Sequence, residues 1–256
     1  MEKPKIRIFN SLARSGGTLV CKCIGCMSDV VLLSEIHPLG THIFNPIAQA
    51  HDWYDLVHRE DLLGKESIDF VEAIQLIERR CTENSKCLVI RDWSHLDFIG
   101  RPYLGQPTHR MTLIDELSSA FEFYRIALVR HPIDQWLSSC KLTGFKEVSL
   151  DNYLCGYLEF AKDIQPFGFV RYEDFTREPE REMIKICEQL KIVFDNRFKE
   201  NWMHYTNITG DTRSRGLTQI KIVSLPRQPI ERELLKEFRA SHNYWEILKM
   251  LGYHDK

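Results

Sequence analysis

Five short apolar segments, separated by helical patterns, most constrain the fold of this chain. They are partly β-branched and show little alternation of apolar and polar side chains, which is typical of strands buried in a parallel sheet. Alternating strands and helices predict an α/β fold, a single domain over residues 1–256 with a central parallel β-sheet flanked by helices. The strands are expected at Ile6–Phe9, Val30–Leu33, Cys87–Ile90, Ile126–Val129 and Phe167–Val170.

Helices are expected where apolar residues recur every three or four positions. One begins near Ile68, another begins at Pro179, and a final helix is expected near Glu231–Leu251. Residues 37–65 and 92–112 are irregular and each follows the end of a strand. Because open α/β sheets bind ligands at that edge, these segments are expected to be loops or short helices that cover a substrate.

The overall charge and the apolar pattern exclude several classes of protein. A formal net charge of −2 gives no electrostatic case for binding nucleic acid. No apolar stretch is long enough to cross a bilayer. A strand is expected almost at the N-terminus, so the pattern of a secretory signal is absent and we expect a cytoplasmic protein.

Three closely spaced cysteines, Cys21, Cys23 and Cys26, raise the question of a metal site. They lack two matched CxxC pairs and fall within an expected helix. We therefore interpret them as small packing residues with reduced thiols, and expect no metal site.

Two strand–turn–helix segments each place an arginine and a hydroxyl where a strand ends. The first spans Ile6–Val20 and contains Arg14; the second spans Phe123–Ser139 and contains Arg130, 116 residues later. In such a turn the free N–H groups and the positive end of the helix attract anions. Two such turns in one α/β chain predict a ligand with two separate anionic ends.

The first turn reads RSGGT over Arg14–Thr18. Its glycines allow close approach of the backbone to an anion, its hydroxyls add donors, and Arg14 adds charge. The Walker A pattern GxxxxGK[ST] is absent, which argues against an ATP-dependent kinase. In the second turn Ser138 follows Arg130 by eight residues. Each segment alone also fits a plain tight turn or an ion pair at the sheet edge.

Together these segments resemble the sulfotransferases that use 3′-phosphoadenylyl sulfate (PAPS), which have a P-loop NTPase-like sulfotransferase fold. Ala13–Thr18 is similar to the 5′-phosphosulfate loop of that family, P-[KR]-[SA]-G-[ST]-T. The spacing from Arg130 to Ser138 is similar to the family's 3′-phosphate motif, and Val170–Leu190 is similar to its YEDL-x-x-x-P stretch. The three motifs occur in the family's order. Arginine at position 14 resembles the bacterial, Golgi and tyrosylprotein branches.

The resemblance implies transfer of a sulfuryl group from PAPS to a hydroxyl, with adenosine 3′,5′-bisphosphate as the product and no metal. The amides of Ser15–Thr18 are then expected to hold the 5′-phosphosulfate. Arg14 is expected to neutralise charge on the bridging oxygen as the S–O bond breaks. Arg130 and Ser138 are expected to bind the 3′-phosphate, and Tyr172 either approaches the adenine or belongs to the core.

The chain also departs from the family pattern. Ala13 replaces the usual proline, and Gly17 replaces a serine or threonine while Gly16 is kept. These changes remove one hydroxyl but leave the backbone nest. A segment near the C-terminus is similar to the basic-glycine segment that closes over the 3′-phosphate, or else forms a solvated basic turn; its residues are Arg213, Arg215 and Gly216.

Transfer to a hydroxyl needs a base for the acceptor proton. Glu35, 21 residues after Arg14, ranks first because a glutamate at similar spacing is the base in tyrosylprotein and many bacterial members. His95 ranks second, near the position of the catalytic histidine of cytosolic members, although its distance from Arg130 is longer than usual. His37 ranks third, and its other interpretation is a hydrogen bond within its loop.

Two other functions stay open on the sequence: a P-loop phosphotransferase and a non-catalytic nucleotide-binding module. The expected acceptor is a hydroxyl on a small molecule, a lipid or a glycan. Arg91 and Asp92 are expected to orient it or to pair with each other. Ring-bearing side chains in the irregular segments hint at an apolar or ring-containing acceptor, or else anchor these loops; they are His42, Trp53, Tyr54, Trp93 and Phe98.

Overall fold

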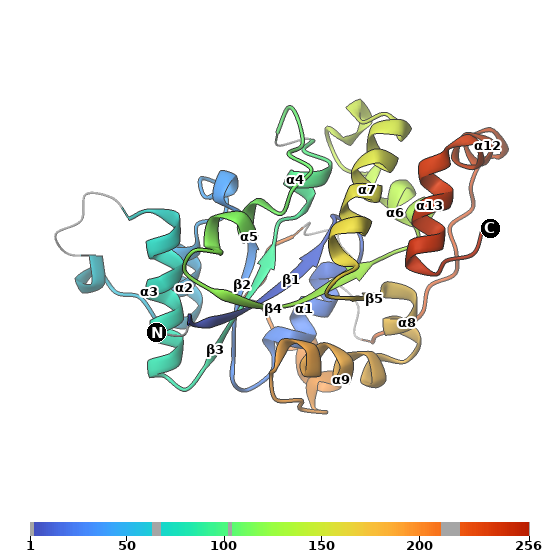
Figure 1. Cartoon of the computed structure of the whole chain (residues 1–256). Coiled ribbons are helices and arrows are strands. Elements are labelled where there is room, and N and C mark those ends of the chain that lie inside the picture. The colour runs from blue at the N-terminus through green and yellow to red at the C-terminus, as the bar shows by residue number, and fades with distance from the viewer. Residues whose placement is uncertain (1–2, 63–67, 102–103, 211–220, 256) are drawn as a thin grey trace.

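The five expected strands form one parallel sheet in the computed structural model, which describes residues 3–62, 68–101, 104–210 and 221–255 (Figure 1). The strand order is β2-β3-β1-β4-β5, and every neighbouring pair is parallel. The predicted α/β fold with a central parallel sheet is therefore confirmed. The strands are β1 Lys5–Ser11, β2 Val30–Ile36, β3 Cys87–Asp92, β4 Glu122–Val129 and β5 Phe169–Arg171.

Successive residues of a strand enter two different cores, as the two-residue period of a strand requires. Phe9 of β1 packs with helices α1 (Gly17–Gly25) and α9 (Pro179–Leu190) on one face. Its neighbour Ile8 packs on the other face with α3 (Phe70–Glu83). Figure 1 shows α9 on one side of the sheet and α7 (Leu150–Ile164) on the other. Helices on both faces explain why the strand sequences are apolar without alternation.

Short polar side chains begin several of these helices. Asp69 accepts a hydrogen bond from the Glu72 amide at 2.8 Å and caps α3. Ser149 caps α7 (Leu150–Ile164) in the same way. Each cap satisfies an amide that has no intrahelical partner. The helical pattern from Ile68 and the helix starting at Pro179 are both confirmed, as α3 and α9.

The single helix expected near Glu231–Leu251 is wrong, because two helices occupy this region: α12 (Arg232–Ala240) and α13 (His242–Leu251). Ser241 between them is extended, with φ −82° and ψ 125°. Both Phe238 and Tyr244 are fully buried, with ring centroids 5.4 Å apart. In one continuous helix, residues six apart would project about 120° away from each other. The break brings both rings into one core.

The two irregular segments contain short helices joined by loops, as expected. Those that begin in the described parts of residues 37–62 and 92–112 are η1 Pro38–Gly40, α2 Pro46–Tyr54, η2 Arg59–Leu62, α4 His95–Phe98 and α5 Thr112–Leu117. The remaining elements are α6 Pro132–Ser139, η3 Phe145–Glu147, α8 Tyr172–Arg177, α10 Phe198–Asn201 and η4 Trp202–His204. None of the helices in the described ranges is both long and apolar enough to span a membrane.

The three clustered cysteines lie on or directly after α1. Cys21 and Cys23 are fully buried in the core between α1 and the sheet. Burial raises the pKa of the Cys21 thiol to about 12, so the metal-binding thiolate form is strongly disfavoured. This placement agrees with a packing role.

Candidate functional site

The two arginine-bearing turns lie side by side because β1 and β4 are neighbours, with Ser11 paired to Leu128. The Arg130 Nη1 atom donates to the backbone carbonyl of Arg14 at 3.1 Å. The Arg14 Nε atom donates to the Ser138 hydroxyl at 3.0 Å. Turns 116 residues apart in the chain thus form one polar surface at the carboxyl edge of the sheet.

Gln135 of α6 fixes the first turn from the second. Its Nε2 atom donates to the Ala13 carbonyl at 2.7 Å and to the Ser15 hydroxyl at 3.1 Å. Its Oε1 atom accepts from the Tyr153 hydroxyl at 2.8 Å, so the amide is held at both ends. Sequence reasoning missed Gln135, because its partners lie 122 and 120 residues away and no local pattern marks it.

Position 16 of the first turn, occupied by Gly16, has no room for a side chain. Its φ is 95°, in the left-handed region, and a Cβ there would lie 2.2 Å from the Tyr172 ring. Tyr172 is largely buried and packs against this glycine. The Arg130 guanidinium lies 5.1 Å from the centre of the same ring. Tyr172 therefore packs against Gly16 of the first turn and lies beside Arg130 of the second turn.

Gly17, the first residue of α1, has a physical reason to replace the family's serine or threonine. A Cβ there would lie 2.5 Å from the Ser11 hydroxyl and 3.4 Å from Arg91 Nη2. The first amides of a helix have no intrahelical acceptor, and its N-terminus is electropositive. The first turn of α1, with Thr18 as its second residue and an arginine beside it, is therefore suited to an anion, and we call it the candidate anion cradle.

Glu35 lies on a bulge of β2. The pairing of β2 with β3 shifts register between Ser34 and Ile36, and Glu35 has φ 58°. Bulges redirect a side chain next to many active sites. Glu35 Oε1 lies 3.2 Å from Arg91 Nη2, and Oε2 accepts from the Thr209 hydroxyl at 2.6 Å. The carboxylate is therefore held by two fixed partners.

Arg91 links this carboxylate to the anion cradle. Besides Glu35, its Nη1 atom donates to the Thr209 carbonyl at 3.1 Å. Its side chain is 8% exposed, and its other Nη atom lies beside Gly17. The expected pairing of Arg91 with Asp92 is not found, because the carboxylate that pairs with Arg91 is that of Glu35.

Asp92 instead belongs to a buried polar network. Its Oδ2 atom accepts from Asn10 Nδ2 at 2.8 Å and from the Ser94 hydroxyl at 2.6 Å. Burial raises the pKa of this carboxyl to about 6; His37 and the two hydrogen bonds lower it, and the charge of Asp97 adds to the rise. Asp92 therefore supports the ends of β1 and β3.

His37 is fully buried. Nδ1 accepts from the Leu39 amide at 3.1 Å, and Nε2 lies 3.2 Å from Asp97 Oδ1. Burial lowers the pKa of His37, but its bond to Asp97 and the charges of Asp92 and Asp97 outweigh burial and raise it overall. This geometry matches the loop-bonding alternative stated for His37.

His95 is also buried. Its Nε2 atom lies 2.8 Å from the Arg101 carbonyl, so Nε2 carries the hydrogen. Its Nδ1 atom has no hydrogen-bond partner within the described part of the chain. Burial lowers the pKa of His95 to about 4, so the ring is neutral at pH 7. His95 offers a lone pair at Nδ1 but little basicity.

The C-terminal residues expected near the nucleotide, Arg213, Arg215 and Gly216, lie outside the described residues. The residues just before them, Thr209 and Gly210, lie beside the candidate site. Thr209 contacts Glu35 and Arg91, and a Cβ on Gly210 would lie 2.8 Å from the Thr18 hydroxyl.

Two aromatic residues expected near the acceptor are buried. Trp93 is 5% exposed and meets Phe44 edge-on, with ring centroids 5.0 Å apart. Phe98 is fully buried against Phe160. Both match the loop-anchor alternative.

Comparison with known proteins identifies the fold. No protein-family model matches the chain, and no curated protein matches it in sequence. Among solved structures, the sulfotransferase domain from the curacin biosynthetic pathway aligns with TM-score 0.67 and 16% identity over 100% of both chains. The sulfotransferase domain of the Synechococcus PCC 7002 olefin synthase aligns with TM-score 0.64 and 16% identity over 99% of this chain and 97% of that one. An Alicyclobacillus acidocaldarius sulfotransferase aligns with TM-score 0.51 and 11% identity over 99% and 98%. The chain therefore has the sulfotransferase fold expected from its motifs.

Proposed function

We propose that this protein is a sulfotransferase that moves a sulfuryl group from PAPS to a hydroxyl of a small molecule, lipid or glycan. The observation that carries the proposal is the junction of the two arginine turns, where Arg130 bonds the Arg14 carbonyl and Arg14 bonds Ser138. A donor with a 5′-phosphosulfate and a 3′-phosphate has two anionic ends that match these two turns.

The residues present fit this donor. A glycine-lined cradle at the start of α1 suits the 5′ end, because backbone amides and the helix dipole favour an anion there. Arg130 supplies a fork of donors and Ser138 a neutral one for the 3′-phosphate. The donor supplies the sulfuryl group; the chain supplies binding, charge and a base.

Glu35 is our first choice for the base. In the proposed step the acceptor oxygen forms a bond to sulfur while its proton passes to the Glu35 carboxylate. The bond from sulfur to the bridging oxygen breaks, and its electron pair stays on that oxygen. Arg91 and Thr209 hold the carboxylate at the side of the cradle and leave lone pairs free for the proton.

Arg14 and Arg91 are the cations we assign to the transfer. Charge develops on the bridging oxygen as the bond breaks, and a fixed arginine stabilises it without reorganisation. Arg14 extends from the loop itself, and Arg91 reaches Gly17 from β3. Arg91 also fixes the base, so it couples acceptor activation to the donor end.

His95 and His37 are weaker candidates for the base than Glu35. The pKa of His95 is lowered to about 4 by burial, which weakens it as a base at neutral pH. Nδ1 of His37 accepts from the Leu39 amide in its own loop, and Nε2 lies 3.2 Å from Asp97 Oδ1 in the buried interior.

Ligand binding and turnover together test the proposal. Adenosine 3′,5′-bisphosphate is expected to raise the melting temperature, adenosine 5′-phosphate to raise it less, and Mg-ATP to leave it unchanged. With ³⁵S-labelled PAPS, label is expected to move to at least one member of a panel of phenols, sterols, lipids and sugars. Stabilisation by Mg-ATP alone would favour a phosphotransferase. Binding of the bisphosphate without turnover on any acceptor would favour a nucleotide-binding module.

A further inference from the structure

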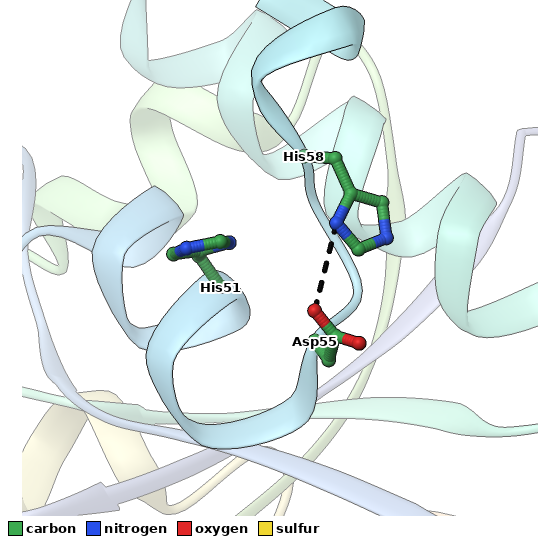
Figure 2. A group of neighbouring side chains, drawn as sticks. All are labelled: His51, Asp55 and His58. Atoms are coloured by element: carbon green, nitrogen blue, oxygen red, sulfur yellow. Dashed lines mark ion pairs between the residues drawn. The ribbon is translucent and has the colours of Figure 1, made fainter.

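A second group of side chains that could bind a ligand lies away from the proposed transfer site, at the end of α2. His51, Asp55 and His58 each offer a ligand atom, and these atoms lie within 4.8 Å of one another. Figure 2 shows the three side chains around a common space, two from the last turn of α2 and its cap and one from the loop segment that follows. All three are exposed. We propose that they bind a divalent transition metal, with zinc as the fitting ion.

The chain reversal at the end of α2 brings these residues together. Asp55 caps the helix in the left-handed region, with φ 53°, and its amide donates to the His51 carbonyl at 2.9 Å. This turn carries the chain back over the last helical turn, so a residue seven positions after His51 returns to it. His58 Nδ1 then lies 3.5 Å from Asp55 Oδ1, as marked in Figure 2.

His51 is oriented as metal-binding histidines are. Its Nδ1 atom lies 2.8 Å from the Val57 carbonyl, which can only accept, so Nδ1 carries the hydrogen. The lone pair is therefore on Nε2. A backbone carbonyl that fixes one ring nitrogen and frees the other is the usual outer partner of a metal-binding histidine.

The distances require a small contraction. With Zn–N and Zn–O bonds of about 2.0–2.1 Å and tetrahedral angles, ligand atoms sit about 3.3 Å apart. Reaching that spacing from at most 4.8 Å takes side-chain rotation of exposed groups, which meet little packing resistance. Two imidazoles and one carboxylate fill three positions and leave the fourth to water.

The metal would act on the structure rather than on sulfuryl transfer. The C-terminal end of α2 is bonded to residues 205–207: the Tyr54 hydroxyl lies 2.5 Å from that of Tyr205, and Asn207 Nδ2 donates to the Trp53 carbonyl at 3.1 Å. A metal joining His51 to His58 fixes the helix end that supports this segment. The sequence did not single out this HxxxDxxH spacing because its three residues become neighbours only through the reversal at Asp55.

Titration of the full chain, freed of any histidine tag and of bound metal, tests the proposal with zinc alone as the probe. We expect one zinc per chain with low-micromolar or tighter affinity, measured by calorimetry or by competition with a chromophoric chelator. Cobalt is expected to give visible d–d bands without the thiolate charge-transfer bands that cysteine ligation produces. Weak binding of several ions, or thiolate bands, would overturn the proposal.

Matched variants localise the site. His51→Ala and His58→Ala are each expected to weaken zinc binding by about 100-fold or more, at least what loss of an outer-shell partner costs. Asp55→Asn tests the carboxylate while keeping a residue that tolerates the left-handed backbone. His242→Ala removes an exposed histidine on α13 and is expected to change nothing. Circular dichroism checks that each variant folds. Unchanged affinity in both histidine variants would overturn the assignment, whatever the result of the sulfuryl-transfer assay.

Discussion

The proposed site has two halves, a donor half and an acceptor half, that are built in different ways. The donor half, between β1 and β4, uses backbone amides and arginines whose positions follow from two local strand–turn–helix motifs. The acceptor half, at the ends of β2 and β3, depends on contacts between distant segments, such as Glu35 with Thr209, 174 residues apart. The donor half can therefore be identified from local spacing, whereas the roles within the acceptor half depend on the tertiary structure.

The acceptor half also separates three candidate bases by their surroundings. Glu35 lies on a bulge, partly open to solvent, and faces Arg91. His37 and His95 are buried and bond to their own loops. On the sequence, all three side chains could accept a proton. In the fold, their different surroundings make Glu35 the best placed of the three for that role.

The largest expected effect is in the donor half. Arg14→Ala is expected to lower kcat by about 10²–10³-fold, the cost of losing one fixed donor to a developing negative charge. Arg14→Lys keeps the charge and is expected to retain most activity. Because Arg14 has φ 65°, alanine and lysine face the same backbone strain as arginine, so the comparison isolates the side chain. Equal activity of the alanine and lysine variants would contradict the role of the charge.

The next effect tests the acceptor half. Glu35→Gln is expected to lower kcat by about 10²-fold, because the amide still accepts from Thr209 but takes no proton. Affinity for adenosine 3′,5′-bisphosphate is expected to stay the same, as calorimetry can check. His95→Asn serves as the counterpart: if it lowers kcat more than Glu35→Gln does, the ranking of the two bases is reversed.

A smaller effect separates the two ends of the donor. Arg130→Ala is expected to weaken binding of adenosine 3′,5′-bisphosphate by about 10–100-fold, the value of a hydrogen bond to a charged group. Adenosine 5′-phosphate lacks the 3′-phosphate, so its affinity is expected to change little. If both nucleotides lose affinity equally, Arg130 supports the loop through the Arg14 carbonyl and does not recognise the 3′-phosphate.

Much of the fold could be predicted because its determinants are local. The apolar runs predict all five strands. They do not predict where β1 and β3 end, because these strands continue into the polar residues Ser11 and Asp92. The break at Ser241 was missed because it depends on burying Phe238 and Tyr244 in one core. Gln135 and Thr209 were missed for the same reason, since their partners lie far along the chain.

The last expected effect is on stability in the acceptor half, with the least effect expected on donor binding. The pKa of Asp92 is raised to about 6 by burial, above its ordinary value of 3.8, so the folded protein holds a proton that the unfolded chain releases between these values. Asp92 therefore makes the protein less stable as pH rises from about 4 to about 6, by about 3 kcal/mol once the carboxyl is ionised. Asp92→Asn keeps an acceptor for Asn10 and Ser94 and removes this penalty. The variant is expected to match the native protein near pH 4 and to exceed its free energy of unfolding at pH 8, as urea denaturation at both values can measure. A variant that is less stable than the native protein at pH 8 but not at pH 4 would show instead that the neighbours of Asp92 need the ionised carboxylate.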